Sequence, residues 1–118
     1  MEVEFDYPKL IGDLSLEQKR KFYVLFAHNL TVSNRGIWSD ESLSNSDKVE
    51  GMKWTNELMH RLVFHIEDLH NISNLKDLNK TDEDLWQEIE HWYSQNYEIV
   101  AGNVGWAIKF SYQTVIEL

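Results

Sequence analysis

Glycine and proline are so scarce in this chain that long uninterrupted helices can form over most of its length. The 118 residues include one proline, Pro8, and five glycines. None of them lies between Leu14 and Arg35 or between Met52 and Ala101. Proline and glycine are the residues that most disfavour a helix interior, so two such stretches favour an all-α fold. With 42% hydrophobic residues, the chain is expected to form one domain over 1–118 with one buried core.

Cap residues and apolar spacing predict a four-helix bundle, with helices at about 15–35, 46–71, 81–96 and 103–116. Ser15 and Gln18 have the spacing of a capping box at the start of the first helix. Thr81 fits the N-cap of the third helix, and it would place the acids at 82–84 in the first turn, where the helix dipole favours them. Residues 1–13 are expected to be extended.

The predicted helix 46–71 carries two adjacent apolar rows, which indicate a wide buried stripe and a central position in the bundle. One row contains Val49, Met52, Asn56, Met59, Val63, Ile66 and His70, and the other contains Thr55, Leu58, Leu62, His65, Leu69 and Ile72. Asn56 is the polar member of the first row. We expect it to hydrogen-bond Asn29 across an antiparallel hairpin. The alternative is that Asn56 specifies a helical dimer.

The segment 103–116 fits two kinds of structure. Apolar residues recur at helical spacing from Val104 to Val115, whereas apolar and polar residues alternate strictly from Trp106 to Gln113. The alternation would suit a strand that pairs with the N-terminal residues in a short terminal β-ribbon. Such a ribbon would need packing against the helices to be stable. We expect the helix, and the ribbon is the alternative.

Negative charge is concentrated in one third of the chain. Residues 66–98 carry nine acids and two bases, a net charge of −7 out of −9 for the whole sequence. Such a surface repels nucleic acid and anionic membranes and favours basic partners. The basic residues cluster only at 19–21, so direct nucleic-acid binding is not expected.

The location of the protein is predicted from three features of the sequence. It contains no cysteine, which excludes disulfides and thiolate chemistry. Its first six residues include three acids, unlike a signal peptide, and no apolar run approaches the roughly 18 residues of a membrane span. We therefore expect a cytoplasmic protein with no membrane association.

Two Glu-x-x-His pairs, Glu57–His60 and Glu88–His91, have the spacing found in carboxylate-bridged di-metal bundles. Both pairs lie on the polar faces of their predicted helices, and the other helices offer carboxylates only near their ends. We therefore reject a metal site. No serine has the surroundings of a nucleophile, and no glycine-rich phosphate loop is present. The sequence predicts neither an enzyme nor a bound cofactor.

Three histidines lie in or beside apolar rows of the predicted helices. They are His28, His65 and His70. A buried imidazole needs polar partners, so each is expected to be a structural histidine at the margin of the core.

The function predicted from these features is a small acidic cytoplasmic protein-binding module. It would act as a stoichiometric inhibitor, antitoxin or immunity-type protein of a basic partner. The residues expected to steer association are Glu67, Asp68, Asp82, Glu83, Asp84, Glu88 and Glu90. Trp86, or Trp38 from the predicted polar loop 36–47, would anchor the partner. One alternative is a self-associating helical scaffold, as a homodimer rather than a monomer, and a second is a small metal-dependent enzyme.

Overall fold

The structure, a computed structural model, describes the backbone of residues 7–72, 75–95 and 98–118, and most side chains within these ranges. The described residues form five helices and no strand: α1 (Tyr7–Gly12), α2 (Leu16–Ser39), α3 (Asn45–Asn71), α4 (Leu75–Gln95) and α5 (Glu98–Glu117). The four long helices pack together, which confirms the predicted all-α four-helix bundle.

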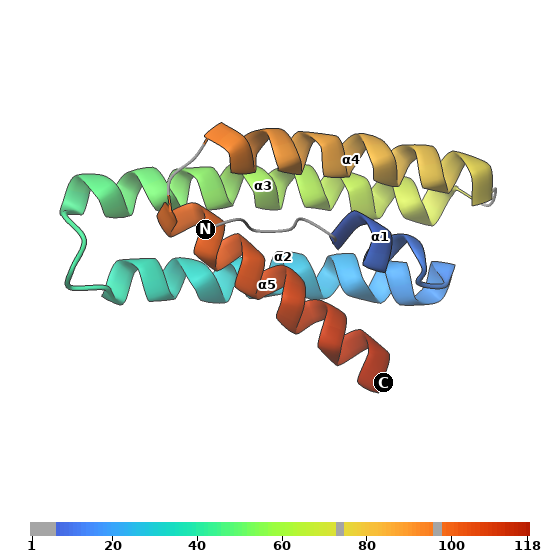
Figure 1. Ribbon diagram of the computed structural model, residues 1–118, viewed down its shortest axis with the longest axis horizontal. Helices are drawn as coiled ribbons and strands as arrows, with labels where there is room; N and C mark the ends of the chain where they lie inside the picture. Colours follow the sequence, from blue (N-terminus) through green and yellow to red (C-terminus); the bar gives the residue numbers. More distant parts are fainter. Residues whose placement is uncertain (1–6, 73–74, 96–97) are drawn as a thin grey trace.

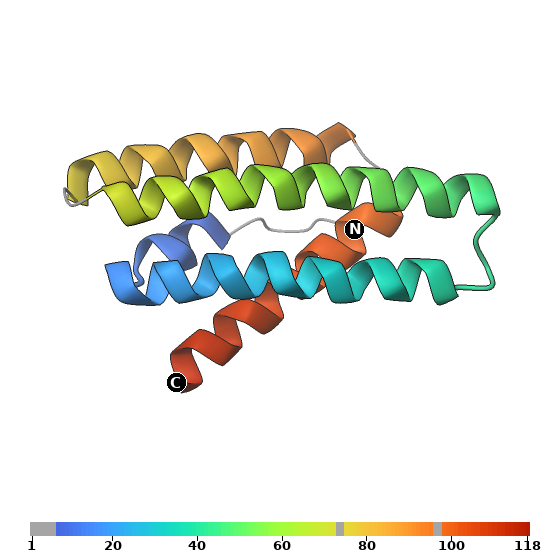
Figure 2. The same ribbon diagram turned by 180° about the vertical axis from the view of Figure 1, so that it is seen from behind.

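Helices α2 and α3 form an antiparallel hairpin, and the other two long helices, α4 and α5, pack against it. α4 lies along α3, and α5 crosses α2 obliquely (Figures 1 and 2). The short helix α1 lies near the beginning of α2 and contacts α4. The molecule is elongated along the hairpin, with extents of 46 × 25 × 24 Å.

Capping explains where the hairpin helices begin. The Ser15 hydroxyl accepts a hydrogen bond from the Gln18 amide, and the Gln18 side chain accepts one from the Ser15 amide, so the predicted capping box is confirmed. Ser44 caps α3 in a similar way. α2 ends at Ser39 instead of 35, because a single helical glycine costs only about 1 kcal/mol and Ile37, just beyond Gly36, is buried.

The beginning of α4 corrects the prediction. The helix begins at Leu75, so Thr81 is not its N-cap and the acids at 82–84 lie in its interior. The buried residues Leu78, Asp82, Leu85 and Ile89 follow helical spacing. Starting the helix earlier therefore adds Leu78 to the buried face. The dipole explanation for these acids does not hold.

The terminal β-ribbon is also wrong for the described residues. Residues 103–116 belong to α5, and 7–12 form α1 instead of an extended segment. A strand would place Ile108 and Phe110 on the same face. In the structure Ile108 is fully buried and Phe110 is 49% exposed, as helical geometry requires. The remaining residues of the predicted N-terminal strand lie outside the described residues.

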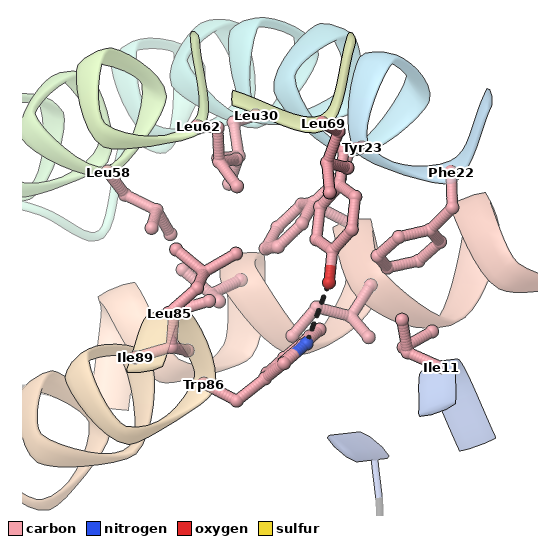
Figure 3. Packing of buried hydrophobic residues seen from close by; sticks show 14 of the residues in the cluster. Ile11, Phe22, Tyr23, Leu30, Leu58, Leu62, Leu69, Leu85, Trp86 and Ile89 are labelled. Atoms are coloured by element: carbon pink, nitrogen blue, oxygen red, sulfur yellow. Dashed lines mark hydrogen bonds between the residues drawn. The ribbon is translucent and has the colours of Figure 1, made fainter. Parts of the chain in front are cut away.

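The core buries only one of the two apolar rows of α3. Leu58, Leu62 and Leu69 are buried against aromatic residues of α2 and apolar residues of α4 (Figure 3). The other row lies at the flank of the hairpin: Val49 and Val63 are 62% and 59% exposed, whereas Met59 and Ile66 are partly buried against the edge of the core. The stripe is therefore narrower than predicted.

The predicted hydrogen bond between Asn29 and Asn56 is wrong. The Asn29 amide donates instead to the Ser111 hydroxyl of α5 at 2.8 Å, inside the core. Asn56 accepts from Asn34 at 2.9 Å on the exposed flank. An amide pair does join the two helices of the hairpin, but the α2 partner is Asn34, because Asn29 faces the crossing helix α5.

Candidate functional site

A cluster of ionisable side chains is buried where α2, α3 and α4 meet. The Asp82 carboxylate lies 2.8 Å from His65 Nε2 through Oδ1 and 3.1 Å from Lys19 Nζ through Oδ2. Lys19 is 1% exposed, His65 is fully buried and Asp82 is 6% exposed. Lys19 Nζ also donates to Asn79 Oδ1 at 3.4 Å. We call Lys19, His65 and Asp82 the buried ionic cluster.

Helical spacing explains why these polar side chains enter the core. Lys19 precedes Phe22, Tyr23 and Phe26 on the buried face of α2. His65 lies between Leu62 and Leu69 on the buried face of α3. Each of these polar residues therefore occupies a position that the hydrophobic pattern of its own helix turns inward. Burial of such groups requires partners, and each helix supplies one for another.

His65 hydrogen-bonds Asp82 through only one ring nitrogen. In the tautomer with the proton on Nε2, the ring donates to the Asp82 carboxylate. Nδ1 is buried and has no hydrogen-bond partner among the described residues. The ring edge contacts Tyr23, with centroids 4.5 Å apart and planes at 74°. His65 is thus held by one polar contact and by aromatic packing.

A buried hydrogen bond lies next to this cluster. The Trp86 indole Nε1–H donates to the Tyr23 hydroxyl at 2.9 Å (Figure 3). Burial of the Tyr23 phenol raises its pKa well above the ordinary value of 10.0, and the negative charge of Asp82 raises the pKa further. The hydrogen bond from Trp86 opposes these effects because it stabilises the phenolate.

A pocket of about 380 Å³ opens above the buried ionic cluster, among α1, the beginning of α2 and α4. The lining residues are Lys9, Gly12, Asp13, Lys19, Asn79, Asp82, Glu83 and Trp86. Lys19, Asp82 and Trp86 are buried and form its floor, whereas Asp13 and Glu83 are exposed and lie at its rim. We call it the α1–α4 pocket.

Most of the predicted partner-binding acids lie on the surface of the molecule. The acidic surface, as we define it, consists of Glu67, Asp68, Glu83, Asp84, Glu88 and Glu90, all exposed. Glu88 forms an ion pair with Arg61 of α3. The two residues line a groove of about 460 Å³ together with Asp84, Gln87 and His91. Arg61 reduces the charge of this groove, and the other acids extend the surface around it.

Two of the predicted binding residues are buried and do not lie on the surface. Asp82 was expected to steer a partner and Trp86 to anchor one, but both are buried, with Trp86 4% exposed. The spacing of Asp82 from Leu78 and Leu85 could have revealed its orientation, as could the position of Lys19 relative to Phe22. The burial of Lys19 was not predicted, because Lys19 was grouped with its basic neighbours at 20 and 21 as one surface cluster.

The other predicted anchor, Trp38, is 59% exposed. It lies in the last turn of α2, not in a loop, and Lys48 Nζ lies 5.6 Å from the centre of its ring. Its position on the surface remains compatible with partner binding.

The histidine and metal predictions have mixed outcomes. His65 is buried with a polar partner, whereas His28 and His70 are exposed, so the core-margin prediction is wrong for those two. Glu57, His60 and His91 are exposed, and Glu88 pairs with Arg61. Within the described residues, no three acidic or histidine side chains are arranged to hold a metal ion.

Comparisons with protein-family models, with curated proteins and with solved structures give no match. None of the helices, over the residues described, is both long and apolar enough to cross a membrane.

The variant Asp82→Asn is expected to lower the free energy of unfolding by about 3–5 kcal/mol, because it leaves the buried Lys19 cation without a counter-charge. Urea unfolding at neutral pH measures this loss. The matched control is Asp84→Asn, which removes an exposed carboxylate two residues away and should change stability by less than about 0.5 kcal/mol. Similar losses in the two variants would contradict the buried ionic cluster.

The variant Tyr23→Phe is expected to weaken the dependence of stability on alkaline pH. The folded protein keeps the Tyr23 proton above pH 10.0, where the unfolded chain releases it, so this contribution is complete below pH 10.0 and is lost as pH rises. The wild type should lose about 1.4 kcal/mol more than the variant per pH unit in this range. Parallel urea unfolding series at increasing alkaline pH would show the difference, and identical slopes would contradict it.

Proposed function

We propose that this chain is a small protein-binding module that associates with a basic protein partner through its acidic surface. The observation that carries the proposal is the exposure of carboxylates along the end of α3 and along α4. Asp82 pairs with Lys19, and Glu88 pairs with Arg61. The other acids within 66–98 whose side chains are described are all exposed: Glu67, Asp68, Asp77, Glu83, Asp84 and Glu90. Lys76 and Lys80 are the exposed bases of this region.

Electrostatic attraction supports binding to a basic protein. The surface keeps an excess of negative charge after its ion pairs are taken into account, and the whole chain carries −9. Such a field accelerates the approach of an oppositely charged partner and repels nucleic acid. It acts mainly on the association rate and weakens as salt increases.

The arrangement of the surface suits a stoichiometric binder. The acids are presented by two adjacent helices, α3 and α4, so their positions are set by rigid elements and not by loops. A rigid charged surface reduces the ordering that binding requires. This is the physical character expected of an inhibitor, antitoxin or immunity-type protein, and it is the class that we propose.

The triple variant Glu67→Gln, Asp68→Asn, Glu90→Gln is expected to slow association with the partner by roughly tenfold at low ionic strength. The partner is the stoichiometric protein recovered from the native host, and stopped-flow or surface-binding measurements give the rate. Added salt should reduce the difference between wild type and variant.

The matched control for this triple variant is Glu41→Gln, Asp47→Asn, Glu117→Gln, which removes the same charges from exposed positions outside the acidic surface. Its association rate should stay within about twofold of the wild type. A recovered partner without excess basic charge, or equal effects of the two triple variants, would contradict the proposal.

The exposed residues on the flank of α3 favour self-association as a second candidate function. Val49 and Val63 project from the flank of the hairpin, and the exposed Asn56 lies between them. Apolar side chains at helical spacing with one polar member are typical of a helix pair that must keep its register. Phe64, which is 63% exposed, adds aromatic area beside Val63.

If this row forms a dimer interface, Val63→Asp is expected to convert the dimer to a monomer, because it places a charge in an apolar contact. Sedimentation velocity over a range of protein concentrations measures the association. Val32→Asp, on α2, changes a comparably exposed valine outside the row and should leave the dimer intact. A wild-type monomer at all concentrations would eliminate this candidate.

A further inference from the structure

A further pocket lies over α2, between the end of α3 and the end of α5. Its volume of about 410 Å³ falls within the range of roughly 300–1,000 Å³ found for small-ligand pockets. We call it the α2 pocket, and its lining residues are Arg20, Lys21, Val24, Leu25, His70 and Leu118. None of them belongs to the acidic surface or to the α1–α4 pocket, so the α2 pocket is a separate candidate site.

The apolar part of the lining is accessible to a ligand. Val24 and Leu118 are 51% and 80% exposed, so a ligand seated here would cover apolar area that the fold leaves in water. Leu25 is half-buried and packs against the core, which gives the pocket a firm base. Each methylene group that becomes buried raises affinity by about fourfold. The pocket therefore favours a ligand with an aliphatic part.

Arg20 provides an accessible hydrogen-bond donor at this pocket. Its Nη2 donates to the Leu69 carbonyl oxygen of α3 at 3.1 Å, which holds the guanidinium in place. Nε is buried, so it takes no part in ligand binding. Nη1 is not among the buried atoms and donates to none of the described residues, so its N–H groups are open to an incoming acceptor. A fixed guanidinium, which is always charged, suits a carboxylate.

The ionisable side chains that line the pocket are all basic. Lys21 and His70 are exposed beside Arg20, and no acidic side chain of the described residues is part of the lining. Glu17 pairs with Lys21 at 3.3 Å, but both side chains are more than half exposed, so this pair is weak. The terminal carboxylate of Leu118 is not ion-paired with these bases in the described part of the chain. The local charges therefore favour an anion.

The charge of the whole chain restricts which anion can bind. With a net charge of −9, the field of the protein opposes the approach of a small anion. The exposed bases alone therefore hold an ion such as acetate only weakly. An anion with an aliphatic chain gains further affinity from the apolar lining. The combination selects an amphipathic anion over a purely polar one.

We infer that the α2 pocket binds an aliphatic carboxylate, of the class of medium-chain fatty acids. The carboxylate accepts hydrogen bonds from Arg20 Nη1 and pairs with Lys21. His70 donates a further hydrogen bond, and the aliphatic chain lies over Val24 and Leu25. This site is independent of the proposed protein partner, because it shares no residue with the acidic surface.

The first experiment titrates sodium octanoate into the ¹⁵N-labelled full chain. We expect a saturable shift of the backbone amide resonances of Val24, Leu25 and His70. Butanoate has four fewer methylene groups and should bind these residues more weakly by about tenfold or more. Octylammonium has the same chain length and the opposite charge, and it should leave the three resonances nearly unchanged. The net charge of the protein by itself predicts the reverse preference, which makes this comparison decisive.

Four outcomes of this titration would overturn the inference. The first is that octanoate produces no saturable shift. The second is that butanoate matches octanoate, which would mean an adventitious ion only. The third is that octylammonium shifts the same resonances equally. The fourth is that octanoate shifts exposed apolar residues elsewhere, such as Val63 and Phe64, to the same extent, which would mean non-specific binding to apolar surface.

A pair of double variants tests the role of the basic residues. Lys21→Gln with His70→Gln changes two lining residues, and the matched control, Lys53→Gln with His60→Gln, changes the same residue types outside the pocket. All four side chains are exposed, so the fold is preserved. The pocket variant should weaken octanoate binding by about tenfold and the control by less than about twofold. Equal losses would count against the pocket.

A second pair of variants tests the apolar lining. Val24→Asp places a carboxylate in the pocket, whereas Val32→Asp makes the same change at a comparably exposed valine of α2 outside it. The first variant should abolish saturable octanoate binding, because it removes apolar contact and repels the anion. The second should stay within about twofold of the wild type. Octanoate binding that survives Val24→Asp would show that the ligand lies elsewhere.

Discussion

The contact of Asp82 with Lys19 and His65 determines how α4 lies on the rest of the bundle. A carboxylate that is buried against a cation and an imidazole cannot rotate outward without leaving Lys19 uncompensated. One turn further along α4, Trp86 then meets the Tyr23 hydroxyl. The same rotation turns Glu83 and Glu90 toward the exterior. One buried ionic contact thus positions a core aromatic residue and the acids outside it.

A buried ionic cluster is an uncertain source of stability. Well-packed apolar residues of similar volume are often as stable as a buried ion pair, or more so, because desolvation offsets the attraction. Its value here lies in specificity: Lys19 from α2, His65 from α3 and Asp82 from α4 satisfy one another only in one relative placement of the three helices. The α1–α4 pocket opens directly above this placement.

Parts of the candidate site could be predicted from the sequence because they depend on local spacing. The exposure of Glu67, Asp68 and Glu90 follows from their positions outside the apolar rows of their helices. Asp82 was assigned to the surface because it lies in an acidic run, although its distance of four residues from Leu78 turns it inward. The α1–α4 pocket lay beyond sequence reasoning, because Lys19 and Asp82 are 63 residues apart and α1 was expected to be extended.

The sequence by itself determined the predominantly helical class, the cap at Ser15 and the concentration of acids in 66–98, and it left 103–116 open between helix and strand. These features depend on propensity, on capping and on periodicity within single segments, which act over a few residues. The tertiary structure decided which row of α3 is buried, that Asn29 meets Ser111, and that Asp82 and Trp86 belong to the core. These outcomes depend on how helices rotate and cross, and that is set by contacts between residues distant in sequence.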